Sequence, residues 1–298
     1  PLCRLARPGG SSEGAAVSGF RPIGAAPGPV VRTAILSVVG ILFAIPILAM
    51  LAFSFRNLAG GYTLAHWASV FSPAATVTYA VVFTGLSNSL LLAVVTVVII
   101  LVILLPTMIL VQLQFPRLRR VLEFVCIIPI TVPAIVVVVG LAPVYSVVAR
   151  LAGSSVWTLA FAYGVTVLPY AYRAIQSNLS AVDIVTLSEA ARSLGAGWGS
   201  VLWRVILPNL RRGILAAAFI TVAVVLGEFT IASLLNRVTL QTALVQVSKS
   251  DPFVPVIFSL LALTFAFVLL LLIGRLASDR RTRRTRPARP ARLEKKAS

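Results

Sequence analysis

The sequence predicts an all-α membrane protein with six transmembrane helices and a helical cytoplasmic element between the fourth and fifth of them. Hydrophobic residues make up 59% of the 298 residues and charged residues 11%, whereas soluble domains are nearer to about 45–50% apolar and 25% charged. The apolar residues form runs that are long enough to cross a bilayer. The net charge of +18 gathers after Leu276 and in short loops between the runs, which indicates membrane orientation rather than nucleic-acid binding.

Three regions are predicted from composition. Residues 1–30 are rich in Gly, Pro, Ser and Ala and are predicted to be a disordered N-terminal cytoplasmic segment. Residues 31–277 form the predicted six-helix transmembrane domain. Residues 278–298 are basic and rich in proline, which predicts a disordered cytoplasmic tail that meets anionic membrane lipid rather than nucleic acid.

The apolar runs define the predicted spans. The first run is too long for a signal-peptide core and lacks a clear cleavage site after it, so we interpret it as a membrane anchor. The stretch "YTLAHWASVF" after it is expected to form an interfacial helix, because aromatic residues suit the headgroup zone. The third run contains "IIPITVPAIVVVVG", whose prolines predict a bent helix. The six predicted spans cover about residues 31–55, 84–111, 121–148, 155–176, 213–235 and 254–277.

The distribution of basic residues predicts that both termini are cytoplasmic. With that orientation the outer side carries only Arg56, Arg150, Arg237 and Lys249, and the asymmetry remains when the tail is removed. The cytoplasmic side then carries the tail and Arg4, Arg7, Arg21, Arg32, Arg117, Arg119, Arg120, Arg173, Arg192, Arg204, Arg211 and Arg212.

Residue types that carry catalysis or bind metal are sparse. Cys3 and Cys126 are far apart and fit neither a disulfide framework nor metal-ligand spacing. His66 has no cysteine or carboxylate cluster near it in sequence and is interpreted as a loop residue. The sequence contains no G-x-x-x-x-G-K-[ST], and "GAGWGS" at 195–200 misses G-x-G-x-x-G because Ser200 occupies the last place. The chain is therefore not expected to be an enzyme or to bind a cofactor.

Residues 177–211 form a polar segment between two apolar runs. In "DIVTLSEAARSLGA" the apolar residues Ile184, Leu187, Ala191 and Leu194 recur at helical spacing. Asp183 is a candidate N-cap and Gly195 a candidate C-terminal stop. Glu189 and Arg192 are one turn apart and could pair, and Ala190 with Ala191 leaves a shallow surface that another protein's backbone can approach. A second short helix is expected from Trp198 to Ile206, ended by Pro208. The segment is predicted to be a helix–turn–helix docking element.

These residues resemble the sequence pattern of the integral-membrane permease subunits of binding-protein-dependent ABC importers. That pattern is Glu-Ala-Ala, then Gly, then Ile-x-Leu-Pro. A valine, Val205, stands where isoleucine is usual. The hydropathy layout resembles the family across about residues 31–277. The matching residues are Glu189, Ala190, Ala191, Gly195, Leu207 and Pro208.

The resemblance implies a mechanism and partners. The segment would be the coupling helix, seated in a cleft of a cytoplasmic ATPase that binds ATP and Mg²⁺. Two such ATPases, a second permease that is similar or identical, and an extracytoplasmic solute-binding protein would complete the importer in a bacterial cell membrane. ATP binding would close the ATPases together and switch the spans from inward-open to outward-open.

Glu228, in "VAVVLGEFTIASLL", is an ionisable residue inside the predicted fifth span. A charge in mid-membrane costs at least roughly 2.5–3.5 kcal/mol on insertion scales, so such residues usually face a bundle interior or a water-filled path. Two interpretations remain open: a residue of the solute pathway that meets a cation, or a structural carboxylate that is paired or hydrogen-bonded.

The solute is expected to be small and polar. Within the family, "LGEFTIASLL" followed by "TLQTALVQ" resembles the subgroup that serves polyamines, ferric iron, thiamine and phosphonates. Spermidine or putrescine is the first choice, since Glu228 and Asp251 favour a cation. Two other classes stay open: a stand-alone proton-coupled secondary transporter that uses Glu228, and a membrane scaffold that interacts through its basic tail.

Overall fold

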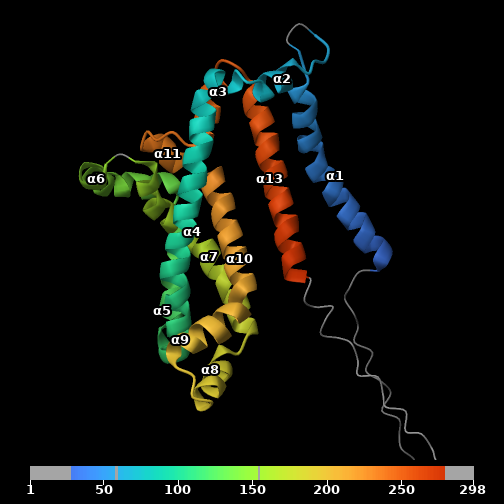
Figure 1. Cartoon of the computed structure of the whole chain (residues 1–298). Coiled ribbons are helices and arrows are strands. Elements are labelled where there is room, and N and C mark those ends of the chain that lie inside the picture. Colours follow the sequence, from blue (N-terminus) through green and yellow to red (C-terminus); the bar gives the residue numbers. More distant parts are fainter. Residues whose placement is uncertain (1–27, 58–59, 154, 279–298) are drawn as a thin grey trace, which may run out of the picture. The chain divides into compact units, whose positions relative to one another are not determined.

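A computed structural model describes residues 28–57, 60–153 and 155–278, which fold almost entirely into helices (Figure 1). The predicted all-α class is confirmed: within these residues the extended pairing is limited to an isolated antiparallel bridge between Arg56 and Tyr62. The predicted disordered segments lie, apart from their residues 28–30 and 278, outside the described residues. The α-helices are α1 (Pro29–Ser54), α2 (Ala65–Phe71), α3 (Ala75–Thr78), α4 (Ala80–Gln114), α5 (Arg119–Thr131), α6 (Ala134–Ala152), α7 (Ala160–Ala181), α8 (Ile184–Ser193), α9 (Trp198–Ser200), α10 (Leu207–Gly227), α11 (Thr230–Leu234), α12 (Leu240–Val247) and α13 (Phe253–Ser278).

Three short segments of other helix types connect them. Two are 3₁₀ turns, η1 (Pro116–Leu118) before α5 and η2 (Val156–Leu159) before α7. The third, η3 (Val201–Ile206), is a π-helical segment that continues directly into α10.

Five helical stretches of the described residues are long and apolar enough to cross a membrane, so the predicted number of six is not confirmed. The stretches are Val30–Ser54, Ala80–Gln114, Ala134–Leu151, Trp198–Gly227 and Phe253–Leu271. The predicted fourth span, 155–176, corresponds to η2 and α7. Polar side chains along α7, including Arg173 and Gln176, lower its hydropathy, and α7 is not among the five.

The predicted third span, 121–148, is broken into two helices. The backbone between them is extended at Val132, with φ −101° and ψ 120°. Pro133 is responsible, because a proline disfavours the helical conformation of the residue before it. The expected bend is thus a full interruption, which leaves α5 and α6 free to run in different directions (Figure 1).

The chain divides into two units, residues 1–49 and 50–298. The described part of the first unit is α1 up to Ala49, an apolar helix that continues through Pro46. The second unit holds the remaining helices and has two buried clusters.

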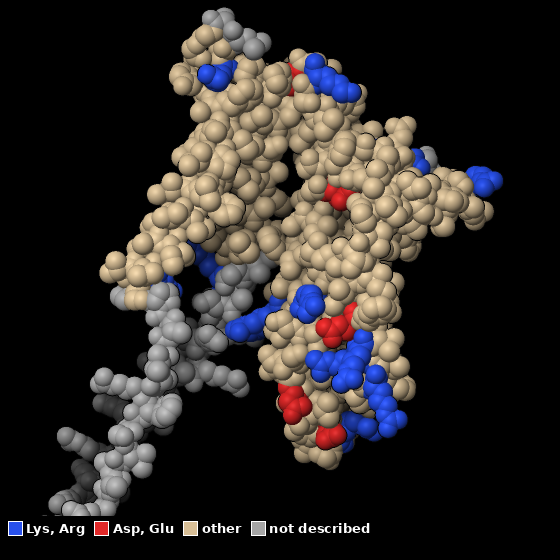
Figure 2. Space-filling model, turned by 180° about the vertical axis from the view of Figure 1, so that it is seen from behind, with Lys and Arg blue, Asp and Glu red and all other residues tan. Residues whose placement is uncertain are grey.

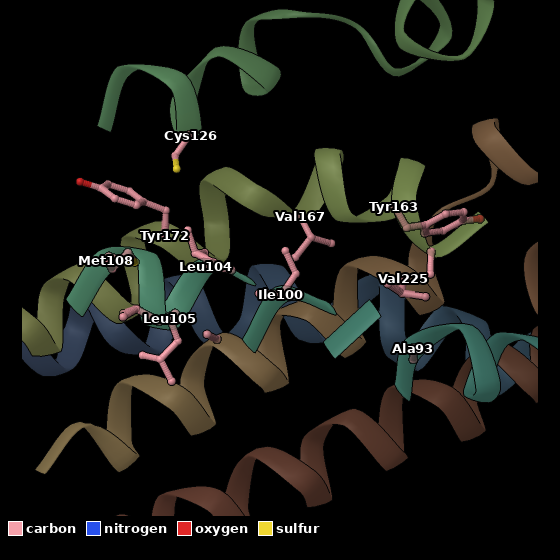
Figure 3. Packing of buried hydrophobic residues seen from close by; sticks show 14 of the residues in the cluster. Ala93, Ile100, Leu104, Leu105, Met108, Cys126, Tyr163, Val167, Tyr172 and Val225 are labelled. Carbon is pink, nitrogen blue, oxygen red and sulfur yellow. The ribbon is translucent and has the colours of Figure 1, made fainter. Parts of the chain in front are cut away.

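The larger cluster of the second unit lies between α4, α7 and α10, with α5 against α7. Figure 3 shows Ile100 of α4 facing Val167 of α7, and Cys126 of α5 beside Tyr172 of α7. Helices α7 and α10 approach closely at Gly213, where an added Cβ would come within 2.7 Å of Asn178 Cβ. The polar segment 177–211 runs from the end of α7 to the start of α10, so both of its ends belong to this packed cluster of helices.

The smaller cluster joins α2, the start of α4, α12 and α13. His66 lies on α2 with its ring stacked on Phe253 at a centroid distance of 4.0 Å, so its predicted place in a loop is wrong. The predicted helix in "YTLAHWASVF" is confirmed as α2. Trp67 Nε1 of α2 donates a hydrogen bond to Ser54 Oγ at 3.1 Å, which connects α2 to residue 54, the last residue of the preceding helix.

Candidate functional site

Helix α8 begins at the predicted cap. The carboxylate of Asp183 accepts hydrogen bonds from Thr186 N at 3.2 Å and from Thr186 Oγ1 at 2.6 Å. These bonds satisfy an amide that has no partner inside the helix and lower the pKa of Asp183 below its ordinary value. The N-terminal end of α8 is therefore defined by one side chain.

The end of α8 is defined by a glycine. Gly195 adopts a left-handed φ of +85°. Its amide donates to Arg192 O at 2.9 Å, and the Ala196 amide donates to Ala191 O at 3.1 Å. This pair of bonds is the Schellman arrangement, in which a glycine just past the helix satisfies the last free carbonyls. The predicted stop at Gly195 is confirmed, and the resulting turn directs the chain back along α8.

The inner face of α8 packs on the bundle and its outer face is open. Ile184 and Ser188 are buried, and α8 contacts η3 and α4. Glu189 and Ala190 are exposed, and Ala191 is half-buried. Leu194, predicted to belong to the inner apolar face, is 89% exposed instead, because it is the residue at which the helix ends and the chain turns.

Arg192 contacts an aromatic ring instead of pairing with Glu189, which its spacing in the sequence allowed. Its guanidinium lies over the ring of Trp198, with the central carbon 4.6 Å from the ring centroid. This cation–π contact connects the end of α8 to the start of α9 across the turn. An exposed ion pair between Glu189 and Arg192 would contribute only about a few tenths of a kcal/mol, so the contact with Trp198 is the more favourable one.

The second half of the element continues into the membrane helix. The predicted short helix, Trp198–Ile206, runs without a break through Pro208 to Gly227, so its predicted end at Pro208 is wrong. Pro208 lies in the first turn of α10, directly after the π-helical η3. A proline is tolerated in the first turn of an α-helix, where its missing N–H is least needed. Beside it, Asn209 Nδ2 donates to Val205 O at 2.7 Å.

The six residues that carry the sequence pattern thus lie on one connected element. Glu189, Ala190, Ala191 and Gly195 belong to α8 and its terminal turn. Leu207, half-buried, and Pro208, exposed, begin α10. They are joined through η3, which packs against α8 and leads into α10.

The outer surface of this element is apolar in places where sequence reasoning did not expect it. Besides Leu194, Trp203 of η3 is 72% exposed, and Leu187 and Trp198 are partly exposed. Figure 2 shows charged side chains gathered at the end of the unit that carries α8 and α9 (compare Figure 1). Exposed apolar side chains bordered by polar ones are typical of protein-binding surfaces. We call Leu187, Glu189, Ala190, Leu194 and Trp203 the α8 surface.

The cap at Asp183 gives a local test. Asp183→Ala is expected to speed amide hydrogen exchange in α8, while Asp183→Asn is expected to preserve it, since asparagine caps equally well. Because the pKa of Asp183 is lower in the folded protein than in the unfolded chain, its carboxylate stabilises the folded state at pH values above the unfolded pKa of about 4. This stabilisation is lost as the pH falls below about 4 and the carboxylate becomes protonated. Exchange measured by mass spectrometry checks the result; equal protection in both variants would contradict the role of the cap.

Glu228 lies at a helix end rather than inside a helix. Helix α10 stops at Gly227, and the backbone of Glu228 is extended, with φ −79° and ψ 122°. Its Oε1 accepts a hydrogen bond from Ile231 N at 3.1 Å, at the start of α11. Gln241 Nε2 donates to Leu226 O at 3.0 Å, at the end of α10. The helix that contains the predicted fifth span, 213–235, therefore begins before residue 213 and ends at Gly227, eight residues before the predicted end. Two side chains satisfy the backbone groups that the break leaves without helical partners.

The segment after this break is tied to α4. Asn88 Nδ2 donates to Val238 O at 2.8 Å, and Ser89 Oγ accepts from Leu240 N at 2.8 Å. An added Cβ at Gly85 would come within 2.6 Å of Thr239 O, so only glycine permits this approach. Sequence reasoning missed Gly85, Asn88 and Ser89, although small and polar residues inside an apolar run are the signal of a close helix contact.

Several long apolar helices indicate a multi-pass helical membrane protein, and the capped helix α8 is not among the stretches long enough to cross a membrane. Comparison with known proteins specifies the class: residues 113–287 match the family described as binding-protein-dependent transport system inner membrane component. The chain belongs to this family.

The chain is also 25% identical over 271 residues to the probable ABC transporter permease protein y4fN of Sinorhizobium fredii. The match covers 84% of this chain and 46% of that protein, so the chain spans about half the length of the curated relative it matches. The family and this relative support a transmembrane permease of the ABC type. Such permeases are membrane components that are not themselves catalytic.

Proposed function

We propose that the chain is the permease subunit of an ABC importer and that α8 is the helix that docks into a cytoplasmic ATPase. The observation that carries this is the α8 surface. Both ends of α8 are held by defined hydrogen bonds, its inner face is packed, and its outer face presents exposed leucines, small residues and a carboxylate. A rigid helix with an open apolar face is suited to a groove on another protein.

The continuity of Trp198–Gly227 supports the transmission of motion. Helix α8 packs on η3, η3 continues into α10, and α10 packs against α4 and α7. A displacement of α8 by a closing pair of ATPases would therefore act on α10 without passing through a loose loop. In this proposal ATP and Mg²⁺ bind only to the partner ATPases, and the membrane helices alternate between inward-open and outward-open states.

The remaining components of the importer follow from the family resemblance. They are a second permease subunit, similar or identical, and a solute-binding protein on the outer side. The charge asymmetry supports cytoplasmic termini in a bacterial cell membrane. Among solutes we propose a small polar cation, with spermidine or putrescine first, because "LGEFTIASLL" and "TLQTALVQ" resemble the polyamine subgroup and the carboxylates of Glu228 and Asp251 favour a cation.

A stand-alone proton-coupled transporter would give Glu228 a different role. The hydrogen bond from Ile231 N gives this carboxylate a structural task, and a proton-coupled mechanism leaves the capped α8 without a purpose. The ABC family membership further favours the importer.

Co-purification of an ATPase tests the proposal. We would tag the full chain, extract it in mild detergent and identify bound proteins by mass spectrometry. Leu194→Lys and Glu189→Lys are expected to lose an ATPase that the wild type retains, since each places a cation on the α8 surface. Leu151→Lys is the matched control, because this leucine of α6 is 83% exposed, close to the 89% of Leu194.

The outcome separates two explanations. Retention of the ATPase by Leu194→Lys and Glu189→Lys would contradict docking through α8. Equal loss with Leu151→Lys would show a general effect of an added charge and would also contradict it.

A further inference from the structure

Helix α5 carries a surface that the proposed function does not use. The helix follows directly on η1, at the end of the long apolar helix α4. Because α4 is longer than the hydrocarbon core is thick, we place this junction near the membrane–water boundary at the end of α4. Arg117 and Arg120 lie there, both exposed, and α5 then runs back along the bundle from that boundary.

Two hollows that share Arg120 as a lining residue lie along this surface. One of about 470 Å³ is lined by Pro116, Arg117 and Arg120. The next, of about 440 Å³, shares Arg120 and is lined by Glu123, Phe124, Ile127, Ile128 and Thr131. The first hollow is basic and the second is mostly apolar, so the surface is amphipathic along its length.

Helix geometry aligns these residues. Arg120, Phe124 and Ile128 are four residues apart and therefore lie on one face of α5. Phe124 is 68% exposed and Ile128 is 40% exposed. From Arg120 to Thr131 the helix rises roughly 16 Å, which is about half of the roughly 30 Å hydrocarbon core. The surface thus has about the length of one bilayer leaflet, and Arg117 and Arg120 lie at the end of it that is next to η1.

Arg117 and Arg120 are available to bind an anion, because the nearby carboxylate of Glu123 lies closer to another arginine. Glu123 is the acidic residue in the second hollow, and its Oε1 lies 3.9 Å from Arg173 Nη1 of α7. Within the described part of the chain, neither Arg117 nor Arg120 forms an ion pair. Guanidinium groups are suited to phosphate, which they hold through two parallel hydrogen bonds.

We propose that the α5 surface, Arg117, Arg120, Phe124 and Ile128 with the hollows beside them, binds an anionic phospholipid. The phosphate lies between Arg117 and Arg120, and an acyl chain follows Phe124 and Ile128 toward Thr131. Basic pockets at the cytoplasmic ends of membrane helices are a recurrent kind of lipid headgroup site. A lipid held here contacts α5 next to α7, which packs against α10, so it is positioned to bias the packing of the bundle.

Native mass spectrometry of the detergent-purified full chain tests this. The probes are phosphatidylglycerol and phosphatidylcholine with identical acyl chains, added separately. The wild type is expected to retain phosphatidylglycerol and not phosphatidylcholine. The Arg117→Gln/Arg120→Gln variant is expected to bind phosphatidylglycerol about thirtyfold more weakly, because two arginine contacts at the lipid phosphate are lost. The Arg117→Lys/Arg120→Lys variant is expected to bind between the wild type and the glutamine variant, because lysine keeps the charge but cannot form the two parallel hydrogen bonds of a guanidinium. Such binding would also show that these positions tolerate substitution.

The charge-matched control is Arg150→Gln/Arg204→Gln, which removes two exposed arginines outside both hollows and is expected to bind like the wild type. An excess of inorganic phosphate should leave the bound lipid in place, since phosphate lacks the acyl contacts. The proposal is overturned by equal retention of both lipids, by unchanged binding in the Arg117→Gln/Arg120→Gln variant, by equal loss in the control variant, by displacement with phosphate alone, or by absence of phosphatidylglycerol from the wild type. Absence of lipid from the wild type, with Phe124→Cys cross-linking to a second copy, would assign the surface to a subunit interface instead.

Discussion

Gly195→Asp is expected to abolish solute uptake while the protein remains in the membrane at normal abundance. The backbone at Gly195 has a φ of +85°, a conformation that costs most residues with a side chain about 1–2 kcal/mol and costs aspartate less than that. The new carboxylate would also stand at the C-terminal end of α8, where the helix dipole disfavours negative charge. Nothing lies within 4 Å of a Cβ built at this glycine, so the expected loss comes from the turn and not from a clash.

Gly197→Asp is the matched control. Gly197 is two residues away with equally open space, but its φ is −71°, and it precedes α9 at a position where aspartate is favourable. Uptake by membrane vesicles, normalised to protein abundance, checks both variants. Normal uptake with Gly195→Asp would contradict the account, and equal loss in both variants would assign the effect to charge rather than to the Schellman turn.

Glu228→Gln is expected to lower transport more than assembly. Glutamine keeps an oxygen that can accept the hydrogen bond from Ile231 N, so the start of α11 is preserved. It removes the negative charge, which the proposed pathway needs to attract a cationic solute. Glu228→Ala removes the charge and the cap together and is expected to lose about 0.5–2 kcal/mol of stability in addition.

Two measurements separate these effects. Transport kinetics report on the charge, and thermal unfolding of the purified chain reports on the cap. Unchanged kinetics with Glu228→Gln, together with destabilisation by Glu228→Ala, would show that the carboxylate is structural and would exclude it from the pathway.

The sequence predicted the helical class and the two ends of α8 because both depend on short-range physics. Apolar runs of bilayer length predict membrane helices, and Asp183 and Gly195 act on backbone groups within three or four residues of themselves. These caps could be found without knowing what surrounds them.

The features that were missed depend on neighbours in space or on the exact backbone path. Pro133 interrupts the third predicted span, whereas Pro208 is accommodated behind a π-helical segment, and the two prolines look alike in sequence. Arg192 selects Trp198 because the Gly195 turn brings the ring to it. The end of α10 at Gly227 is stabilised by Gln241, which lies 15 residues from its acceptor.

Photocrosslinking from α8 tests the central claim most directly. A benzophenone amino acid would replace Ala190, which is exposed on the α8 surface, and in a control chain it would replace Leu151 of α6. The account predicts that Ala190 alone crosslinks to a protein that contains a nucleotide-binding P-loop, and that the yield changes when ATP and Mg²⁺ are added. Absence of such a product from Ala190, under conditions in which uptake is active, would contradict the assignment of α8 as the contact with the ATPase.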